Sequence, residues 1–216
     1  MIKINRKKTP RGLAKTNRSF RDAIAGMSAE AAYDFYKQHE NTYRYNTDET
    51  KQHFRDMNHE RCSFCTKVIS DFDDEMTVEH IRIKRDHPRL IFQWSNMLCA
   101  CRTCNTKRGT RGYVPEKYLD PTKLANIEKY FSYQLDGTMA VNEELDRGDQ
   151  EKADYMIKLY CLNRRDLVCK RREFLRKLMS EKHFYEDLEK LELSSQHIIF
   201  LSVFAYYRGC REEHGE

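Results

Sequence analysis

The chain has 216 residues, of which 39% are hydrophobic and 34% are charged, so it is long enough to bury a core and too apolar to stay disordered. Lysine and arginine outnumber acidic residues 39 to 34, a modest excess that permits nucleic-acid binding without requiring it. No apolar run approaches membrane-spanning length, and no apolar stretch follows the first basic residues. We therefore expect a soluble, cytoplasmic protein without a signal peptide.

Residues 1–25 are predicted to form an extended basic arm, because Pro10 and Gly12 oppose helix formation. The cations that precede the first acid are Lys3, Arg6, Lys7, Lys8, Arg11, Lys15, Arg18 and Arg21. Such an arm is either a solvated tail or a contact for phosphate groups. Lys7, Lys8 and Arg11 are its candidate nucleic-acid-binding residues.

Residues 26–60 are predicted to be helical. Apolar and aromatic side chains recur among many charges between residues 28 and 59, which indicates helices with one buried face. These side chains are Ala32, Phe35, Tyr36, Tyr43 and Phe54.

Residues 61–113 contain two CxxC pairs, Cys62–Cys65 and Cys101–Cys104. Four thiolates at these gaps suit a tetrahedral zinc ion and leave no position open for water, so the zinc should be structural. Cys99 competes with Cys101 as the third ligand, and the repeated two-residue gap favours Cys101. We interpret the remaining cysteines as small core or surface residues.

The same segment is predicted to contain two extended stretches and a helix. Residues 76–83 are rich in branched side chains and indicate a strand, and residues 90–95 indicate a second short extended element. A helix is expected at residues 104–107, ended by Gly109 and Gly112. The segment would then have a ββα order of elements with zinc at its base.

Residues 114–149 form a predicted connector, punctuated by Pro115 and Pro121, with a turn at residues 134–137 before a short strand. Residues 150–216 are predicted to contain three helices. Their apolar positions are Tyr155, Leu159, Leu162, Leu167, Phe174, Leu175 and Leu178, then Phe184, Leu188 and Leu191, then Ile198, Leu201 and Phe204. The fold class is thus α+β and mostly α-helical.

Glu79 and His80 lie between the two cysteine pairs. A carboxylate can hold a divalent cation, and a histidine can remove a proton from water. Neighbouring side chains of a continuous strand point to opposite faces, so both can serve one site only if the strand ends there. Asn105 is a candidate second metal ligand, and Asn96 a candidate support for the loop that presents His80. Lys107 and Arg108, next on the short helix, either meet phosphate or are merely solvated.

The order CxxC, Glu-His, Asn, CxxC-Asn and Lys resembles the HNH endonuclease family. Within it, several stretches look like the HNH component of Septu-type anti-phage systems (PtuB-like proteins), which is also met as an effector in retron systems. They are residues 1–6, His87-Pro88, residues 92–96, Asp120-Pro121, Asp136-Gly137 and residues 162–167. That branch often has an aromatic residue and a proline after its Glu-His, whereas residues 81–84 here are Ile-Arg-Ile-Lys.

The resemblance implies a zinc-stapled ββα-metal core with His80 as general base and Asn96 as its orienter. It places Mg²⁺ or Mn²⁺ on Glu79 and Asn105, and a structural Zn²⁺ on Cys62, Cys65, Cys101 and Cys104. It also implies a DNA substrate, with tRNA as the alternative, and an ABC- or SMC-like (PtuA-like) ATPase partner, joined by RNA–DNA in a retron setting. Two rival interpretations stay open: a non-catalytic zinc-finger module that binds nucleic acid, and an adaptor that regulates the ATPase.

Overall fold

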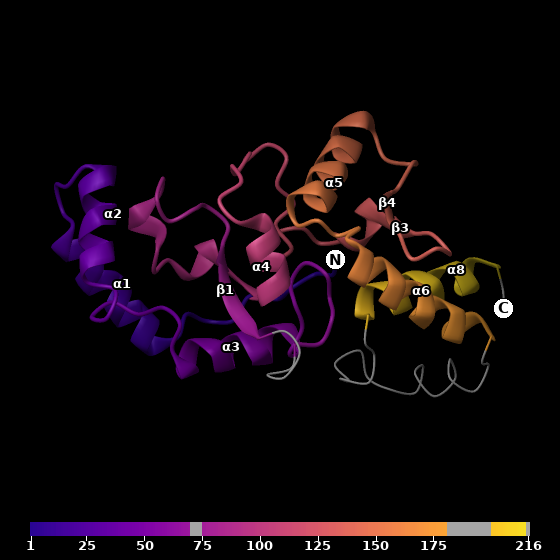
Figure 1. Cartoon of the computed structure of the whole chain (residues 1–216), viewed down its shortest axis with the longest axis horizontal. Coiled ribbons are helices and arrows are strands. Elements are labelled where there is room, and N and C mark those ends of the chain that lie inside the picture. Colours follow the sequence, from indigo (N-terminus) through magenta and orange to yellow (C-terminus); the bar gives the residue numbers. More distant parts are fainter. Residues whose placement is uncertain (70–74, 181–199, 215–216) are drawn as a thin grey trace.

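The structure is a computed structural model that describes residues 1–69, 75–180 and 200–214 (Figure 1). It is a mixed α/β fold in which helices surround two small antiparallel sheets, β1–β2 and β3–β4. The helices are α1 (Arg11–Ala23), α2 (Ala29–Gln38), α3 (Asp48–Asn58), α4 (Arg102–Arg108), α5 (Arg147–Leu159), α6 (Arg165–Ser180) and α8 (Leu201–His214). The strands are β1 (Met76–His80), β2 (Met97–Cys101), β3 (Phe131–Tyr133) and β4 (Met139–Val141).

The predicted extended conformation of residues 1–25 is wrong from residue 11 onward, where α1 begins. Pro10 stands just before the first helical residue, a position that its fixed φ tolerates. The N–H of Gly12 donates to Oε2 of Glu49 on α3 at 3.0 Å, so an acid from another helix supplies the missing cap. Leu13 and Phe20 are buried on one face of α1, and this burial outweighs the weak local tendency of Pro10 and Gly12 against helix formation.

Residues before α1 form no helix or strand and are not a solvated tail. Met1 and Ile4 are buried, and the N–H of Ile4 donates to the carbonyl of Pro121 at 2.9 Å. Trp94 Nε1 donates to the carbonyl of Lys7 at 2.9 Å. The first ten residues therefore lie fixed against the middle of the chain.

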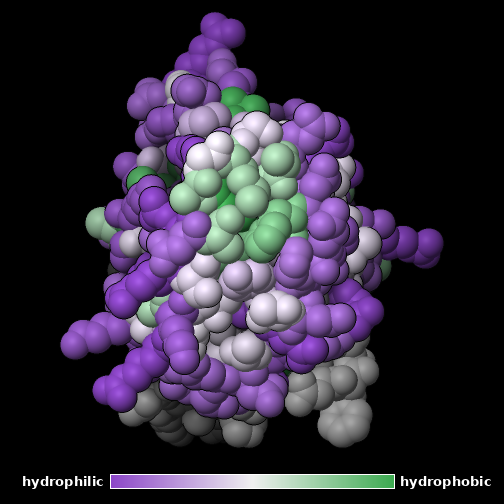
Figure 2. All heavy atoms as spheres, turned by 90° about the vertical axis from the view of Figure 1, so that its left-hand side faces the viewer, coloured by the Kyte–Doolittle hydropathy of each residue, from purple (hydrophilic) through white to green (hydrophobic). Residues whose placement is uncertain are grey.

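The helices predicted between residues 28 and 59 are confirmed as α2 and α3. Ser28 caps α2 by accepting from the N–H of Ala31, and Thr47 caps α3 by accepting from the N–H of Thr50. With α1 they form the left-hand end of the molecule in Figure 1. The face shown in Figure 2 carries a small apolar area within a hydrophilic surround.

β1 and β2 pair antiparallel, with Val78 opposite Cys99 and His80 opposite Met97. The second extended element predicted at residues 90–95 is wrong: 3₁₀ turns occupy Pro88–Leu90 and Trp94–Asn96, and the strand starts at Met97. Pro88 opens the first turn, and the apolar run reflects burial rather than extension. α4 follows β2 directly and ends at Gly109, so the elements run in the predicted ββα order.

The hairpin β1–β2 separates two buried cores. Met97 and Cys99 belong to the core of the N-terminal helices, whereas Leu98 and Ala100 belong to the core that contains the C-terminal helices. This division follows from the alternation of side chains along a strand. The hairpin is thus covered on both faces and held rigidly.

The turn predicted at residues 134–137 is confirmed, and it joins β3 to β4. The first apolar run predicted after residue 150, from Tyr155 to Leu178, is helical but is divided between α5 and α6, and α8 covers Leu201 and Phe204 of the third run. Phe174 packs edge-on against Phe200. The predicted positions Phe184, Leu188, Leu191 and Ile198 lie outside the described residues. Among the helices that the structure describes, none combines the length and the apolar character needed to cross a bilayer.

Candidate active site

A buried cluster of four cysteines lies at the base of the hairpin and α4. Cys62, Cys65, Cys101 and Cys104 place their Sγ atoms within 4.8 Å of one another, and Cys65 Sγ lies 3.9 Å from Cys101 Sγ. Zn–S bonds of about 2.3 Å set tetrahedral sulfurs about 3.8 Å apart. The four side chains therefore fit a structural zinc ion.

The structure places Cys101 in this cluster, whereas Cys99 lies in the core of the N-terminal helices. Burial raises the pKa of the Cys99 thiol, so it behaves as a small apolar side chain. The Sγ of Cys101 also accepts from the N–H of Cys104 at 3.4 Å and caps α4. The cysteine cluster and the start of α4 are therefore one local structure.

Arg164 also reaches the cluster, and the sequence offered no signal for it. Its Nη1 donates to Cys104 Sγ at 3.5 Å from a position 60 residues further along the chain. Four thiolates on one divalent ion carry excess negative charge, which a neighbouring guanidinium offsets. The side chain thereby ties the segment before α6 to the metal cluster.

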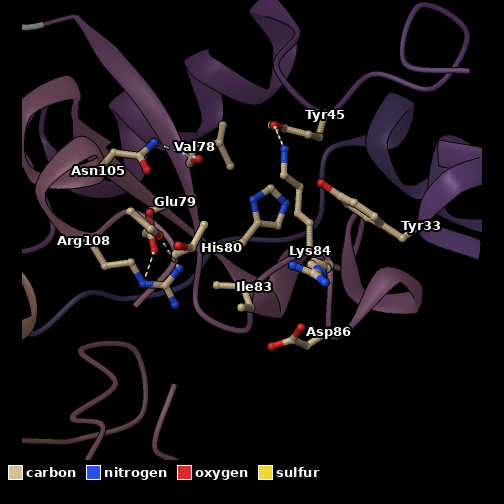
Figure 3. Close-up of a pocket in the computed structure, with 13 residues that line it drawn as sticks. Tyr33, Tyr45, Val78, Glu79, His80, Ile83, Lys84, Asp86, Asn105 and Arg108 are labelled. Atoms are coloured by element: carbon tan, nitrogen blue, oxygen red, sulfur yellow. Dashed lines mark hydrogen bonds and ion pairs between the residues drawn. The ribbon is translucent and has the colours of Figure 1, made fainter. Parts of the chain in front are cut away.

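A cavity of about 480 Å³ lies on the other side of α4, where β1 ends (Figure 3). β1 contributes Glu79 and His80, and α4 contributes Asn105 and Arg108. The loop after β1 and the N-terminal helical region close the remaining wall with Lys84, Tyr33 and Tyr45. The structure thus gathers in one cavity three of the predicted catalytic residues, Glu79, His80 and Asn105.

Glu79 is buried beside Arg108. Its Oε1 lies 3.1 Å from Arg108 Nε, and both side chains are 3% exposed. Neither of these two atoms makes a hydrogen bond. Burial raises the pKa of Glu79 to about 8, although the charge of Arg108 opposes this rise. Oε1 has only its ion pair with Arg108 and no hydrogen bond, so the carboxylate keeps oxygen lone pairs that suit a divalent cation in the cavity.

Arg108 is buried, which rules out simple solvation, one of the two alternatives that the sequence left open for it. Its Nη2 donates to the carbonyl of Ile81 at 2.8 Å, and Nη1 donates to that of Gly109 at 3.3 Å. The short helix turns this position toward β1, so the side chain is buried. Arg108 can reach a phosphate only from the cavity wall.

His80 is buried in the cavity wall and oriented by the backbone. Its Nε2 lies 2.8 Å from the carbonyl oxygen of Ile91, which can only accept, so Nε2 carries the proton and Nδ1 keeps its lone pair. The ring of Tyr45 meets the imidazole edge-on with centroids 4.7 Å apart. Burial lowers the pKa of His80 to about 3, so the ring is neutral and Nδ1 is unprotonated.

Asn96 holds the loop that follows His80. Its Oδ1 accepts from the N–H of Arg82 at 2.8 Å, and its Nδ2 donates to the carbonyls of Arg82 and Leu90 at 3.1 Å each. The N–H of Ile81 donates to the carbonyl of Asn96 at 2.9 Å. These bonds end β1 at His80, so Glu79 and His80 both line the cavity despite the alternation of a strand.

Asn105 presents its amide oxygen to the same cavity. Its Nδ2 donates to Thr77 Oγ1 at 2.9 Å and to the carbonyl of Val78 at 3.4 Å. Because both contacts use the nitrogen, Oδ1 is the atom left for a cation. An amide oxygen and a carboxylate are the donors that Mg²⁺ and Mn²⁺ prefer.

The remaining predicted cations lie elsewhere. Lys107 is exposed on α4, and Lys7, Lys8 and Arg11 are exposed around the start of α1; none of them lines this cavity. Sequence reasoning missed Lys84, whose Nζ donates to Tyr45 Oη at 2.9 Å. The tyrosines that cluster before residue 46 could have suggested an aromatic wall for the cavity, but no local sequence pattern shows that this segment lies next to His80.

The chain is 33% identical over 84 residues to the Septu protein PtuB of Bacillus thuringiensis. The aligned part is 38% of this chain, and the chain spans about a third (33%) of the length of that curated relative. No family model matches the chain. The comparison therefore supports a relationship to Septu proteins without extending over the whole of either chain.

Proposed function

We propose that the protein is a metal-dependent nuclease of the HNH type that hydrolyses phosphodiester bonds in nucleic acid. The observation that carries this proposal is the cavity in which Glu79, His80 and Asn105 meet, with Asn96 supporting the loop behind them. A base with a free lone pair, two oxygen donors for a cation and nearby positive charge are what phosphodiester hydrolysis needs.

Glu79 and Asn105 are the residues that would hold a catalytic Mg²⁺ or Mn²⁺. The carboxylate of Glu79, whose Oε1 makes no hydrogen bond, and the amide oxygen of Asn105 fit such a hard cation. A cation bound there stabilises negative charge on the phosphate and on the departing oxygen. The four cysteines would hold zinc as a purely structural ion.

In this mechanism Nδ1 of His80 takes a proton from a water molecule. The hydroxide oxygen forms a bond to phosphorus as the opposite P–O bond breaks, and the released oxygen leaves with the electron pair. An anionic phosphate in the cavity raises the low pKa of His80 and so strengthens it as a base. Lys84 and Arg108 in the cavity wall provide that phosphate with compensating positive charge.

The similarity to a Septu protein supports a role in anti-phage defence. In that role the chain would be the effector, and a PtuA-like ATPase of the ABC or SMC kind would restrain and release it. We favour DNA as the substrate, with tRNA as the alternative; a cavity that grips a phosphate more than a base is compatible with both. In a retron setting, RNA–DNA would join the complex.

His80→Ala tests the proposal. We expect Mg²⁺- or Mn²⁺-dependent cleavage of plasmid DNA, single-stranded DNA or tRNA to fall at least about 10²-fold, because the base is lost. Zinc content and circular dichroism should stay unchanged. His53→Ala, on α3 outside the cavity, is the matched control and should keep full activity.

Full cleavage by His80→Ala would refute the assignment. Nucleic-acid binding by the wild-type chain with no metal-dependent cleavage, alone or with the ATPase, would instead identify a non-catalytic binding module. Stimulation of the ATPase without cleavage or binding would identify an adaptor.

A further inference from the structure

α1 carries a row of exposed cations on the face opposite its buried side. Arg11, Lys15 and Arg18 follow one another at helical spacings of four and three residues, so they lie on one face. Leu13 and Phe20 occupy the opposite face and are buried. We propose that this row, the α1 stripe (Arg11, Lys15, Arg18), binds the phosphate backbone of nucleic acid outside the cleavage cavity; this inference rests on the proposed nuclease function.

The α1 stripe is not neutralised within the protein. No member of it forms an ion pair with any residue in the described ranges 1–69, 75–180 and 200–214. In contrast, Lys117 and Arg147 pair with Glu151, and Lys158 pairs with Asp154. The stripe therefore keeps its charge available for an external anion.

The charge pattern does not serve the stability of the helix. The first turn of α1 contains no acid of its own and begins with Arg11, so the cation stands at the positive end of the helix dipole, where the carboxylate that caps Gly12 comes from Glu49 of α3. The first turns of α2, α3, α5 and α6 contain acids, whereas those of α4 and α8, like that of α1, contain none. Cations three and four residues apart also repel each other, and a bound polyanion would remove this repulsion.

A membrane surface does not fit this helix. An amphipathic helix binds a bilayer through its apolar face, but the apolar face of α1 is already buried in protein. Only the charged face remains open, where Arg11, Lys15 and Arg18 are exposed. A nucleic-acid backbone offers the regular row of negative charge that such a face matches.

α1 is also fixed to the segment that orients the proposed base. The ring of Phe20 meets that of Phe92 with centroids 4.8 Å apart, and Asn17 Nδ2 donates to Gln93 Oε1 at 3.4 Å. Ile91, next to Phe92, supplies the carbonyl that binds His80. A strand held on the stripe would therefore keep a constant position relative to the cavity.

The length of the stripe limits how many phosphates it binds. Arg11 and Arg18 are separated by about 10 Å along the axis at about 1.5 Å per residue. At about 3.4 Å per phosphate along one strand, this distance spans about three phosphates. Asp22 follows one turn beyond Arg18 and marks the end of the stripe. The contact is with backbone only, so it should not depend on base sequence.

The test replaces all three cations in the full chain: Arg11→Gln, Lys15→Gln and Arg18→Gln together. Glutamine keeps the helical preference of these exposed positions. The matched control, Lys117→Gln with Arg147→Gln and Lys158→Gln, removes the same charge from residues that already have acidic partners. Both sets are made in a His80→Ala background to prevent cleavage, and fluorescence anisotropy measures binding to a DNA duplex and to tRNA across a salt series.

The stripe variant should bind the duplex, the tRNA or both at least about tenfold more weakly at 0.1 M salt. Its slope of log Kd against log salt should fall by about two to three, because each lost phosphate contact lowers the slope by about 0.7 to 0.9. The control variant should change neither quantity. Whichever probe responds identifies the class of nucleic acid that the stripe binds.

Hydrolysis of bis(4-nitrophenyl) phosphate with Mn²⁺ separates this inference from the proposed function. Because this small diester reaches only the cavity, the stripe variant with His80 intact should hydrolyse it at the wild-type rate, and His80→Ala should not. If the stripe variant binds both nucleic acids with wild-type affinity, the inference about the stripe is overturned but the nuclease proposal is not. The same holds if the stripe variant loses binding to the ATPase and to neither nucleic acid. Absence of hydrolysis in the wild type contradicts the nuclease instead.

Discussion

The buried position of the Glu79 carboxylate lowers the stability of the folded protein. It is 2% exposed, and its Oε1 faces Arg108 Nε without a hydrogen bond. A buried carboxylate without full hydrogen bonding favours its protonated form, which is why the pKa of Glu79 rises to about 8. Such costs are common where a residue serves binding or catalysis rather than folding.

Glu79→Gln should therefore stabilise the magnesium-free protein. Since the pKa in the folded state is raised, the contribution of Glu79 is most favourable at low pH, and stability is lost as the pH rises from about 4.5 toward 8. At pH 8 we expect the variant to be at least about 1 kcal/mol more stable, which raises the Tm by about 2–4 °C.

Thermal melts at several pH values between 5 and 8 measure this effect. The difference between variant and wild type should widen as the pH rises, and the variant should lose metal-dependent cleavage. A difference in Tm that stays constant between pH 5 and 8 would show that the pKa of Glu79 is not raised by burial.

At the scale of elements, the β3–β4 hairpin docks on α6 through a glycine. Gly137 has φ +89°, and a Cβ built there would lie 2.2 Å from the carbonyl oxygen of Val168. Arg171 then donates to the carbonyl of Gly137 at 3.3 Å and to that of Leu162 at 2.6 Å. The turn and the helix thus meet at backbone contact, which leaves no room for a side chain.

Gly137→Ala should destabilise the protein much more than Gly26→Ala. Gly26 has a similar φ of +80° but has nothing within 4 Å of a built Cβ, so alanine there costs only the conformational strain, about 1–2 kcal/mol. Gly137→Ala adds the clash with α6 and should cost at least about 1–3 kcal/mol more. Chemical denaturation of both variants checks this; equal losses would contradict the close packing.

At the scale of the whole molecule, the cysteine cluster joins the hairpin to the C-terminal helices. The ring of Phe64, between Cys62 and Cys65, stacks on Tyr160 with centroids 3.6 Å apart, and Arg164 binds Cys104. Cys62 and Cys104 belong to the core that also contains residues of α5, α6 and α8. Loss of the cysteine cluster should therefore destabilise the packing of the C-terminal helices as well as the loops that carry the cysteines.

Cys62→Ser should lower the free energy of unfolding by on the order of 3 kcal/mol or more and reduce bound zinc, because binding of a structural metal contributes directly to folding. Cys169→Ser, at an exposed position on α6, is the control and should change neither quantity. Metal analysis and thermal melts measure both effects. A zinc-free but stably folded Cys62→Ser protein would contradict the structural role.

Local patterns predicted much of the fold. The spacing of apolar residues located α2, α3, α5 and α6, the branched residues located β1, and Gly137 located the turn between β3 and β4. Local reasoning failed at α1 and at residues 90–95. In both places distant contacts decide: Glu49 caps α1, and burial of Ile91 and Phe92 selects turns instead of a strand.

The sequence alone determined which residues can act as ligands, since the type and spacing of Cys62, Cys65, Cys101 and Cys104 follow from the chain itself. It also located Glu79, His80, Asn96 and Asn105 within one segment. Tertiary structure decided what surrounds them: Ile91 sets the tautomer of His80, Arg108 turns inward to Glu79, and Tyr45 and Lys84 close the cavity. The physical reason is that burial and hydrogen bonding depend on contacts between distant segments, which local spacing does not encode.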